Sequence, residues 1–540
     1  MPKKYSFTLP LLLGLAVALG ILLGAQFSGS TSAAAKIGSS TKFEYILSTI
    51  KNNYVDPVEE GPLVEDAVTG MLKKLDPHSV YISADELQQM NEPLEGNFEG
   101  IGIEFNLLRD TIVVVSAITG GPSEAVGLRA GDKIIAVEDQ DMTGPDITNQ
   151  DVIDNLRGEK GTEVEVTVRR RGVSGPLKFT ITRDKIPLYS VVAHHMVDQN
   201  TGYIKITRFS AKTYDEFKQA IEPLQEQGMN NLILDLRGNP GGYLQAAIRI
   251  SDEFLAKDKL IVYTEGRERP KREYKASRPG HFEQGKLVVL IDEGSASASE
   301  IVSGAVQDWD RGLLVGRRSF GKGLVQESFR LPDGAAMRLT IARYYTPSGR
   351  SIQRPYDEGA DAYYQEVVDR LEEGELSSRD SVHLADSLRY TTNNGRMVYG
   401  GGGVMPDWFV PLDTAGNSSF FNALMRKGVI NQFTLQYMDR HRKEMNRTYD
   451  DSRSFAKQYK VDQALVRQLA AYAQKQGVKA QMPAPGTEQM ARIRHNLKSL
   501  MARQLYGQDG FFRIFNQKNS AFQRAMELIH SAKPWEALSS

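Results

Sequence analysis

The chain has no cysteine, and this absence excludes several kinds of protein at once. Without thiols there is no disulfide framework, no cysteine nucleophile, no zinc–thiolate site and no lipid-modified N-terminal cysteine. An excess of one charge is also missing, because 66 basic residues stand against 67 acidic ones. Balanced charge gives no bulk attraction to nucleic acid, so we expect no nucleic-acid partner. The length of 540 residues allows several domains.

Long apolar runs are rare, and the one at the N-terminus extends from Leu9 to Ala25 behind two lysines. Such a segment can span a bilayer, and basic residues before it keep the N-terminus cytoplasmic. We therefore expect residues 1–27 to form a signal anchor, a single-pass helix in the cell inner membrane, with the remainder in the periplasm. Small residues from Ser32 onward leave a second interpretation open, in which the segment is cleaved and the chain is exported.

Changes in sequence pattern divide the chain further. Residues 28–95 are expected to be a Ser/Ala/Gly-rich tether followed by an N-terminal helical region, in which His78 is a turn residue rather than a ligand. The segment 357–382 is charged, which indicates an exposed helical insertion. Polar amphipathic helices predict a C-terminal helical domain over 413–540, a candidate adaptor or homo-oligomer surface.

Two strand–loop–helix units stand in the middle of the chain. The first, NLILDLRGNPGG, leads through a glycine-rich loop at 237–242 into a helix, where free backbone N–H groups can bind an oxyanion. The second, KLVVLIDEGSASASEIVSGAVQ, places Ser297 at the strand-to-helix bend. Two such units predict a parallel or mixed sheet with its site at the strand ends. Ser295 and Ser299 compete with Ser297, and Ser299 is also typical of a helix N-cap.

A serine hydroxyl needs an adjacent base before it can act as a nucleophile. Between Lys286 and Lys427 the sequence has thirteen arginines and a single lysine, Lys322. Arginine stays protonated, whereas burial readily strips the charge from a lysine, so Lys322 is the candidate base. Gln326 is placed to orient its amine. The alternative is that Lys322 faces water in a Gly-Lys-Gly turn.

Residues 96–184 alternate strands with two short helices, and Val126–Val137 matches AGLxxGDxIxxV, a signature of PDZ domains. With FEGIGIEF, DLRGNPGG, EGSASASEIVSGAVQD, GKGLVQ and YYTPSGRSIQ, the chain resembles the C-terminal processing (tail-specific) proteases from about residue 41 to 412. The resemblance implies an α+β multidomain protein. Its parts are the membrane anchor, a helical segment, a PDZ domain at 96–184, a mixed α/β serine protease core at 185–412 and the C-terminal helical domain.

The resemblance also implies roles for individual residues. Ser297 is the nucleophile, Lys322 the general base 25 positions later, and Gln326 the partner of the lysine. The oxyanion hole is implied to consist of the backbone N–H of Ala298 and of a glycine, which is Gly241 with Gly242 as the runner-up.

The PDZ domain of related enzymes binds the substrate tail as an added strand and gates the catalytic centre. Arg157 matches the arginine that holds the active arrangement. The tail-binding positions are Phe98, Gly100, Ile101, Gly102 and Ile103.

The expected activity is that of a serine endopeptidase that cleaves proteins near accessible C-terminal tails, in periplasmic processing or quality control, without a metal or organic cofactor. Two alternatives stay open. One is a PDZ adaptor whose catalytic fold is silent, and the other is a serine–histidine–acid hydrolase. The second has no histidine available between His281 and His383 in the sequence.

Overall fold

The computed structural model describes residues 12–20, 39–107, 111–118, 120–383 and 385–539. The chain divides into two units, 1–72 and 73–540. In the first, residues 12–20 are helical and two further helices follow, α2 (Ser39–Asn53) and α3 (Glu60–Leu72). The expected anchor lies largely outside the described residues. Among those described, no helix combines the length and the hydropathy that a membrane crossing requires.

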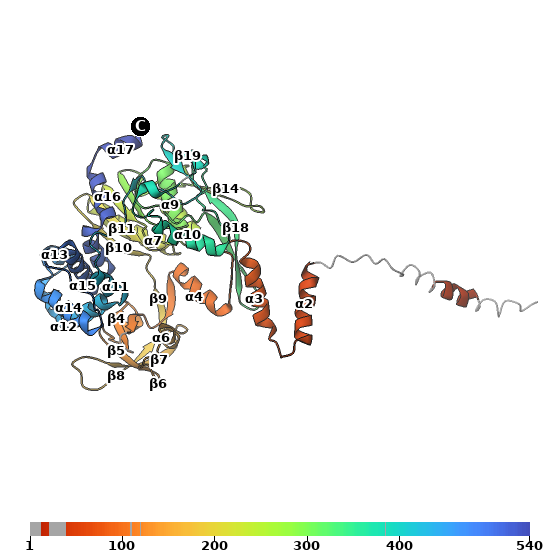
Figure 1. Cartoon of the computed structure of the whole chain (residues 1–540), viewed down its shortest axis with the longest axis horizontal. Coiled ribbons are helices and arrows are strands. Elements are labelled where there is room, and N and C mark those ends of the chain that lie inside the picture. The colour runs from red at the N-terminus through yellow and green to blue at the C-terminus, as the bar shows by residue number, and fades with distance from the viewer. Residues whose placement is uncertain (1–11, 21–38, 108–110, 119, 384, 540) are drawn as a thin grey trace, which may run out of the picture. The chain divides into compact units, whose positions relative to one another are not determined.

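The second unit is built on a six-stranded sheet in the order β10-β11-β12-β15-β16-β21. Figure 1 labels the first two of these strands, β10 and β11. Only the β10–β11 pair is antiparallel. The carboxyl ends of β11, β12, β15 and β16 therefore meet at one edge, as a mixed sheet with a site at its strand ends requires. The strands are β10 (Val191–Met196), β11 (Thr201–Ile206), β12 (Asn231–Asp235), β15 (Lys286–Ile291), β16 (Leu313–Gly316) and β21 (Trp408–Phe409).

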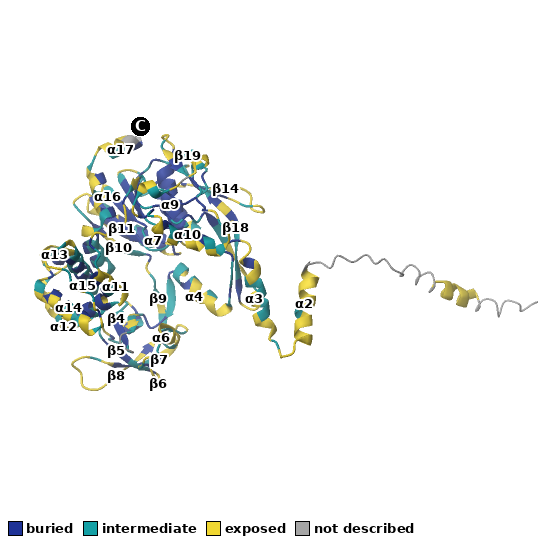
Figure 2. Cartoon of the chain, in the orientation of Figure 1, coloured by how far each residue is buried: buried dark blue, intermediate teal, exposed yellow. Residues whose placement is uncertain are grey.

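Alternation along the strands gives this sheet two buried faces. Leu232 and Leu234 pack into a core with the helices α7 (Thr213–Glu226), α8 (Leu244–Asp252) and α9 (Ala298–Asp308). Ile233 packs into a second core against α16 (Ser520–His530). Every residue of α9 is buried, as its colour in Figure 2 shows. Both faces are covered, which is typical of a parallel sheet.

A second sheet contains β17, whose first residue, Leu324, follows Lys322 by two positions. Its strands follow the order β1-β18-β13-β14, and β17 pairs with β18. The short strand β1, which follows the Asp76–His78 turn, was not expected from the sequence. The strands are β1 (Val80–Ile82), β13 (Leu260–Glu265), β14 (Arg272–Lys275), β17 (Leu324–Arg330) and β18 (Ala336–Tyr345), and helix α4 (Ala84–Glu95) follows β1.

The region predicted as a PDZ domain has its own sheet, in the order β3-β4-β5-β7-β8, and its own apolar core. Strand β3 lies at one edge. A two-stranded ribbon of β2 and β9 encloses this region at its two ends. The elements are β2 (Asn97–Gly100), β3 (Ile103–Leu107), β4 (Ile112–Ala117), α5 (Pro122–Ala125), β5 (Lys133–Val137), β6 (Gln140–Asp141), α6 (Asn149–Leu156), β7 (Glu163–Arg169), β8 (Leu177–Thr182) and β9 (Asp184–Pro187).

The segment 357–382 contains α10 (Ala360–Glu372), but the expectation of an exposed insertion is wrong for one face of this helix. Tyr363 and Arg370 are both only 3% exposed. The Arg370 guanidinium donates to Glu375 Oε1 and to the backbone of Arg318, which ties α10 to the core. The small ribbon of β19 (Arg389–Thr391) and β20 (Met397–Tyr399) follows.

The C-terminal helices belong to two cores. Helices α11 to α14 and most of α15 pack around their own apolar centre, whereas α16 covers the six-stranded sheet. Non-helical backbone at Tyr506 and Gly507 divides α15 close to the point where the chain passes from the first of these cores to the second. The helices are α11 (Ser419–Arg426), α12 (Val429–Thr448), α13 (Ser452–Gln458), α14 (Gln463–Lys475), α15 (Glu488–Phe515) and α17 (Lys533–Ser539).

Because α16 packs against the six-stranded sheet, a substitution in its buried face should lower the free energy of unfolding. The Phe522 ring is 6% exposed and meets the Tyr203 ring edge-on, with the centroids 5.6 Å apart. We expect Phe522→Ala to destabilise the unit built on the six-stranded sheet by about 3–5 kcal/mol, the usual cost of replacing a buried phenylalanine with alanine. Urea unfolding followed by tryptophan fluorescence measures this. Gln523→Ala, at an exposed position of the same helix, is the matched control. Equal urea midpoints for the two variants would contradict the packing of α16 against the sheet.

Candidate active site

Ser297 stands where β15 gives way to α9, as its sequence pattern predicts. Its φ of 53° is in the left-handed region, which costs a non-glycine residue about 1–3 kcal/mol. Hydrogen bonds hold the bend: the Ser297 N–H donates to Glu300 Oε2 at 2.8 Å, and the Ser297 carbonyl accepts from Tyr344 Oη at 3.1 Å. The half-buried serine lines a cleft of about 1490 Å³.

The two competing serines face the interior. Ser295 Oγ donates to the carbonyl of Leu236, and Ser299 Oγ donates to the carbonyl of Asn239, each at 2.9 Å. Both residues are fully buried. The N-cap of α9 is Ser297, so the interpretation of Ser299 as the cap is wrong. Of the three serines, only Ser297 lines the cleft.

Lys322 lines the same cleft and is half-buried. Its Nζ donates to Gln326 Oε1 at 3.0 Å, and Gln326 Nε2 donates to the carbonyl of His78, so the amide is fixed at both ends. Burial and then the positive charge of Arg338 lower the pKa of Lys322 to about 8. Within the described part of the chain, no hydrogen bond joins Lys322 Nζ to Ser297 Oγ in this conformation.

Glu300 connects the segment that contains Ser297 to the segment that contains Lys322. No prediction from the sequence assigned this role to Glu300. One carboxylate oxygen accepts from Ser319 Oγ at 2.5 Å and from the Gly321 N–H at 2.7 Å. The other accepts from the N–H groups of Ser297 and Lys322, at 2.8 and 2.9 Å. Burial raises the pKa of Glu300, while these donors oppose that shift. A single side chain thus fixes the backbone of the serine and of the lysine.

His78 also belongs to the site. Its Nε2 lies 3.1 Å from Tyr363 Oη, and its ring meets the Tyr363 ring edge-on. Burial and then the charge of Lys322 lower the pKa of His78 to about 4. A turn residue was expected and a turn is found, but its carbonyl supports Gln326. The DPHS turn gave no signal of this contact, because it depends on a strand some 250 residues away.

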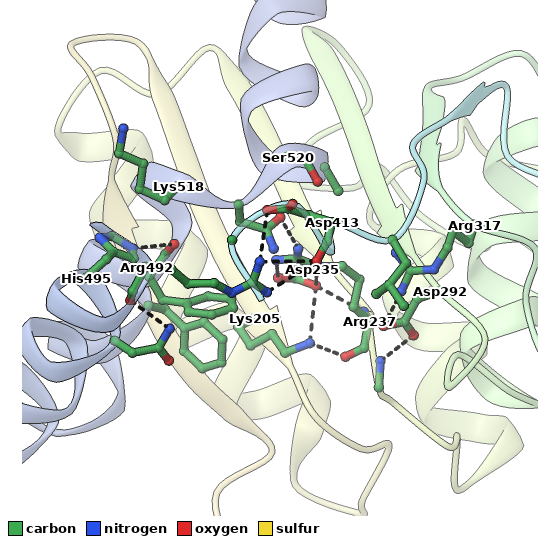
Figure 3. A pocket seen from close by; sticks show the side chains of 18 of the residues that line it. Lys205, Asp235, Arg237, Asp292, Arg317, Asp413, Arg492, His495, Lys518 and Ser520 are labelled. Carbon is green, nitrogen blue, oxygen red and sulfur yellow. Dashed lines mark hydrogen bonds and ion pairs between the residues drawn. The ribbon is translucent and has the colours of Figure 1, made fainter. Parts of the chain in front are cut away.

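The DLRGNPGG loop, residues 235–242, is anchored by buried charge. Arg237 Nε and Nη2 donate to the two oxygens of Asp235, at 2.9 and 2.5 Å, and Lys205 Nζ donates to Asp235 Oδ1 at 3.2 Å. Figure 3 shows these three side chains pointing toward one another at a pocket of about 520 Å³. Asn519 Oδ1, at the start of α16, accepts from Arg237 Nη1 at 2.5 Å. The C-terminal helices therefore support this loop.

The other end of the loop faces Ser297. A Cβ added to Gly241 would lie 2.8 Å from Ser297 Cβ and 2.9 Å from the Ala298 nitrogen. The Gly241 N–H donates to Asn239 Oδ1 at 2.9 Å. Among the residues described, the N–H groups of Ala298 and Gly242 have no acceptor. In this conformation Gly242 is therefore the freer donor of the two glycines.

The expected tail-binding positions lie together at the edge of the PDZ sheet. Phe98 and Gly100 belong to β2, Ile103 begins β3, and Ile101 and Gly102 connect the two strands. Gly102 has a φ of 74°, and within the described ranges its N–H has no acceptor. An edge strand next to a free N–H is the arrangement that receives a peptide as an added strand.

Arg157 joins the PDZ region to the wall of the cleft. Its Nη1 donates to Glu92 Oε2 of α4 at 2.5 Å, and its guanidinium lies 4.9 Å from the centre of the Phe98 ring. Leu94 and Glu95, at the end of α4, line the cleft that holds Ser297. Arg157 thus contacts a tail-binding residue on one side and the cleft-forming helix on the other.

Across the described ranges, no group of three or more histidine, aspartate or glutamate side chains could hold a metal ion. The arrangement instead combines a serine at a strained bend, a desolvated lysine, free backbone N–H groups and a PDZ-like sheet edge. These features define a serine-type peptidase with a peptide-binding module.

Comparison with known proteins gives the family. Residues 200–359 match peptidase family S41, 100–181 match the PDZ domain, and 25–86 match the N-terminal domain of the activating protease CtpB. Residues 420–507 match a family of unknown function. The carboxy-terminal-processing protease of Bartonella bacilliformis is 37% identical over 316 residues, which are 58% of this chain and 72% of the relative. The chain belongs to the carboxy-terminal processing proteases, as its motifs predict.

Two further similar proteins illustrate the range of the comparisons. The carboxy-terminal processing protease CtpB of Bacillus subtilis is also 37% identical over 316 residues, 58% of this chain and 65% of that protein. Among solved structures, a photosystem II D1 C-terminal processing protease is 27% identical, with 69% of this chain and 88% of the other covered and a TM-score of 0.36.

Proposed function

We propose that this serine protease uses a Ser297–Lys322 dyad, with Gln326 as the positioning partner of the lysine, to cleave proteins near their C-termini. The observation that carries the proposal is the state of Lys322: a desolvated amine with a pKa of about 8, held by Gln326 in the cleft that Ser297 lines. At neutral pH roughly one lysine in ten is then deprotonated, against one in several thousand at the ordinary pKa.

The chemistry follows from these groups. Neutral Lys322 takes the proton of Ser297 Oγ as the oxygen attacks the scissile carbonyl. The N–H groups of Ala298 and Gly242 stabilise the oxyanion, and Gly241 joins them when Asn239 releases its N–H. Protonated Lys322 then gives its proton to the leaving amine. Water repeats the cycle on the acyl-enzyme, with Lys322 again as the base.

The PDZ domain selects the tail and gates the cleft. The substrate's last residues add to β3, with the carboxylate at the loop formed by Gly100, Ile101 and Gly102. Arg157 couples this event to α4 through Glu92, because it also contacts Phe98 beside the tail site. A tail bound there shifts the equilibrium of the cleft toward the active arrangement.

The pH dependence of activity tests the base. Lys322 must be deprotonated, so we expect kcat/KM to rise about tenfold per pH unit below pH 8 and to level off above it. Lys322→Arg should be inactive at every pH, since arginine keeps its proton. A profile that bends instead near pH 6.5 would indicate a histidine base. His78 is a poor candidate, because its pKa is about 4 and its Nε2 contacts Tyr363.

The cellular setting is proposed from the N-terminal sequence. Basic residues before an apolar run place the anchor in the inner membrane and the protease in the periplasm, where it processes proteins or removes damaged ones. Fusion of a periplasm-dependent reporter after residue 540 distinguishes this from the opposite orientation. The C-terminal helices serve as an adaptor or homo-oligomer surface, which light scattering on the intact chain measures.

One experiment addresses the function itself. An unstructured protein is offered with an apolar C-terminus and, as a matched pair, with the same tail amidated. We expect cleavage of the free tail, mapped by mass spectrometry, much slower cleavage of the amide, and none by Ser297→Ala. Unchanged cleavage by Ser297→Ala would reject the dyad. If the intact chain binds tails but cleaves nothing, the adaptor interpretation replaces the enzyme.

A further inference from the structure

The cleft that holds Ser297 has an unbalanced charge. Its acidic lining residues are Glu95 and Glu327, and Glu327 already contacts Arg269 at 2.7 Å outside the cleft lining. One basic residue, Arg249, has partners, since it lies over the Tyr214 ring and pairs with Asp215 at 3.6 Å. The basic lining residues are Arg208, Arg249, Lys322, Arg330 and Arg338.

Arg338 is the arginine that the fold places beside the lysine. In the β17–β18 pair, Gln326 stands opposite Thr340 and Ser328 stands opposite Arg338. Alternate residues of a strand share a face, so Arg338 follows Gln326 along the face that holds Lys322 Nζ. Arg338 and Lys322 line the same cleft, and the positive charge of Arg338 lowers the pKa of the lysine.

This guanidinium is half-buried, and within the described residues it has no hydrogen bond, ion pair or ring contact. Among the described residues, Asp76 forms no ion pair with Arg338, and its oxygens accept from the N–H of His78, from Ser79 Oγ and from Thr340 Oγ1. Other arginines of the core are paired: Arg318 and Arg370 share Glu375, and Arg350 contacts Asp308. A partly desolvated arginine without a counter-ion gains strongly from an incoming carboxylate.

We propose that Arg338 forms an anion-binding subsite for an acidic side chain of the substrate close to the scissile bond. The subsite rests on the proposed function, because it acts on the peptide that Ser297 attacks. Tyr243, which follows Gly241 and Gly242, lines the same cleft and raises the pKa of Arg338 against the effect of burial. A carboxylate bound to Arg338 would share this cleft with Ser297 and Lys322.

The test uses peptides that share one apolar tail and one cleavage site. Asp, Asn or Lys is placed in turn at each position on either side of the scissile bond, and each peptide is made as the free acid and as the C-terminal amide. We expect one position at which Asp exceeds Asn by about 10- to 100-fold in kcat/KM, the range of a charge-assisted pair. If the preference for Asp over Asn persists among the amidated peptides, the group recognised is the side-chain carboxylate. If the preference disappears when the C-terminus is amidated, the group recognised is the terminal carboxylate, and the proposed subsite is wrong.

Variants assign the preference to one residue. The Asp-to-Asn ratio is taken within each variant at one pH, so that a change in the pKa of Lys322 cancels. Arg338→Gln should bring this ratio to about one, and Arg338→Glu should favour Lys. Arg330→Gln, from the same cleft, is the matched control and should keep the wild-type ratio. Equal cleavage of Asp and Asn peptides by the wild type, or a ratio that follows Arg330 instead, overturns the proposal while the protease function stands. No cleavage of any peptide rejects both.

Discussion

Gly241→Ala is expected to lower kcat by about 10²- to 10³-fold, the cost of losing one oxyanion donor. The new methyl group would lie 2.9 Å from the Ala298 nitrogen and 2.8 Å from the Ala296 carbonyl oxygen. It would therefore fill the space in front of the Ala298 N–H, where the oxyanion forms. KM should change little, because the oxyanion exists only in the transition state and intermediate. Steady-state kinetics on one peptide substrate measures both constants.

Backbone strain must be separated from this blockage, because Gly241 has a φ of 100°. Gly238 provides the control: it belongs to the same loop, has a φ of 62°, and a Cβ there meets nothing within 4 Å. Gly238→Ala carries the strain without the obstruction, so it should keep most of its kcat. Equal losses in both variants would show that distortion of the loop, rather than a blocked oxyanion hole, reduces the rate.

Glu300→Gln should damage both stability and catalysis. The carboxylate accepts four hydrogen bonds, and an amide of the same shape presents an NH₂ group to two of these donors. We expect a loss of about 3–5 kcal/mol in the free energy of unfolding, typical of a disrupted buried network. The backbones of Ser297 and Lys322 would also shift, and a misplacement of about 1 Å costs roughly 100-fold in kcat.

Thermal unfolding and kcat are measured on the same preparations of this variant. Glu327→Gln is the control, since its exposed pair with Arg269 should contribute about 0–1 kcal/mol. If Glu300→Gln unfolds like the wild type and keeps its kcat, Glu300 does not position the dyad. A loss of stability with unchanged kcat would limit its role to the fold.

The C-terminal helices gain a structural role from the same contacts. Asn519 accepts from Arg237, which in turn holds Asp235 at the start of the DLRGNPGG loop. The amphipathic pattern of the sequence predicts one C-terminal helical domain over residues 413–540. The structure places α16 on the six-stranded sheet, so the end of the chain helps to fix the loop that contains Gly241 and Gly242.

Local pattern was sufficient for much of the fold. Strand–loop–helix periodicity predicted the strands and helices around 231–252 and 286–308, and the PDZ signature predicted a sheet with two short helices. Strand β1 was missed because three residues carry too little periodicity, and it pairs with β18, far away in the sequence. The buried face of α10 was missed because Arg370 donates to the backbone of Arg318, 52 positions earlier, as well as to the neighbouring Glu375.

The sequence by itself determined which residues are chemically able to act: a serine at a strand-to-helix bend, one lysine among thirteen arginines, and a glutamine four positions later. Only the tertiary structure decided their states. Burial and the charge of Arg338 lower the pKa of Lys322, Glu300 fixes two backbones, and the carbonyl of His78 holds Gln326. Desolvation and hydrogen bonding depend on contacts between segments far apart in the chain, and local sequence patterns do not contain those contacts.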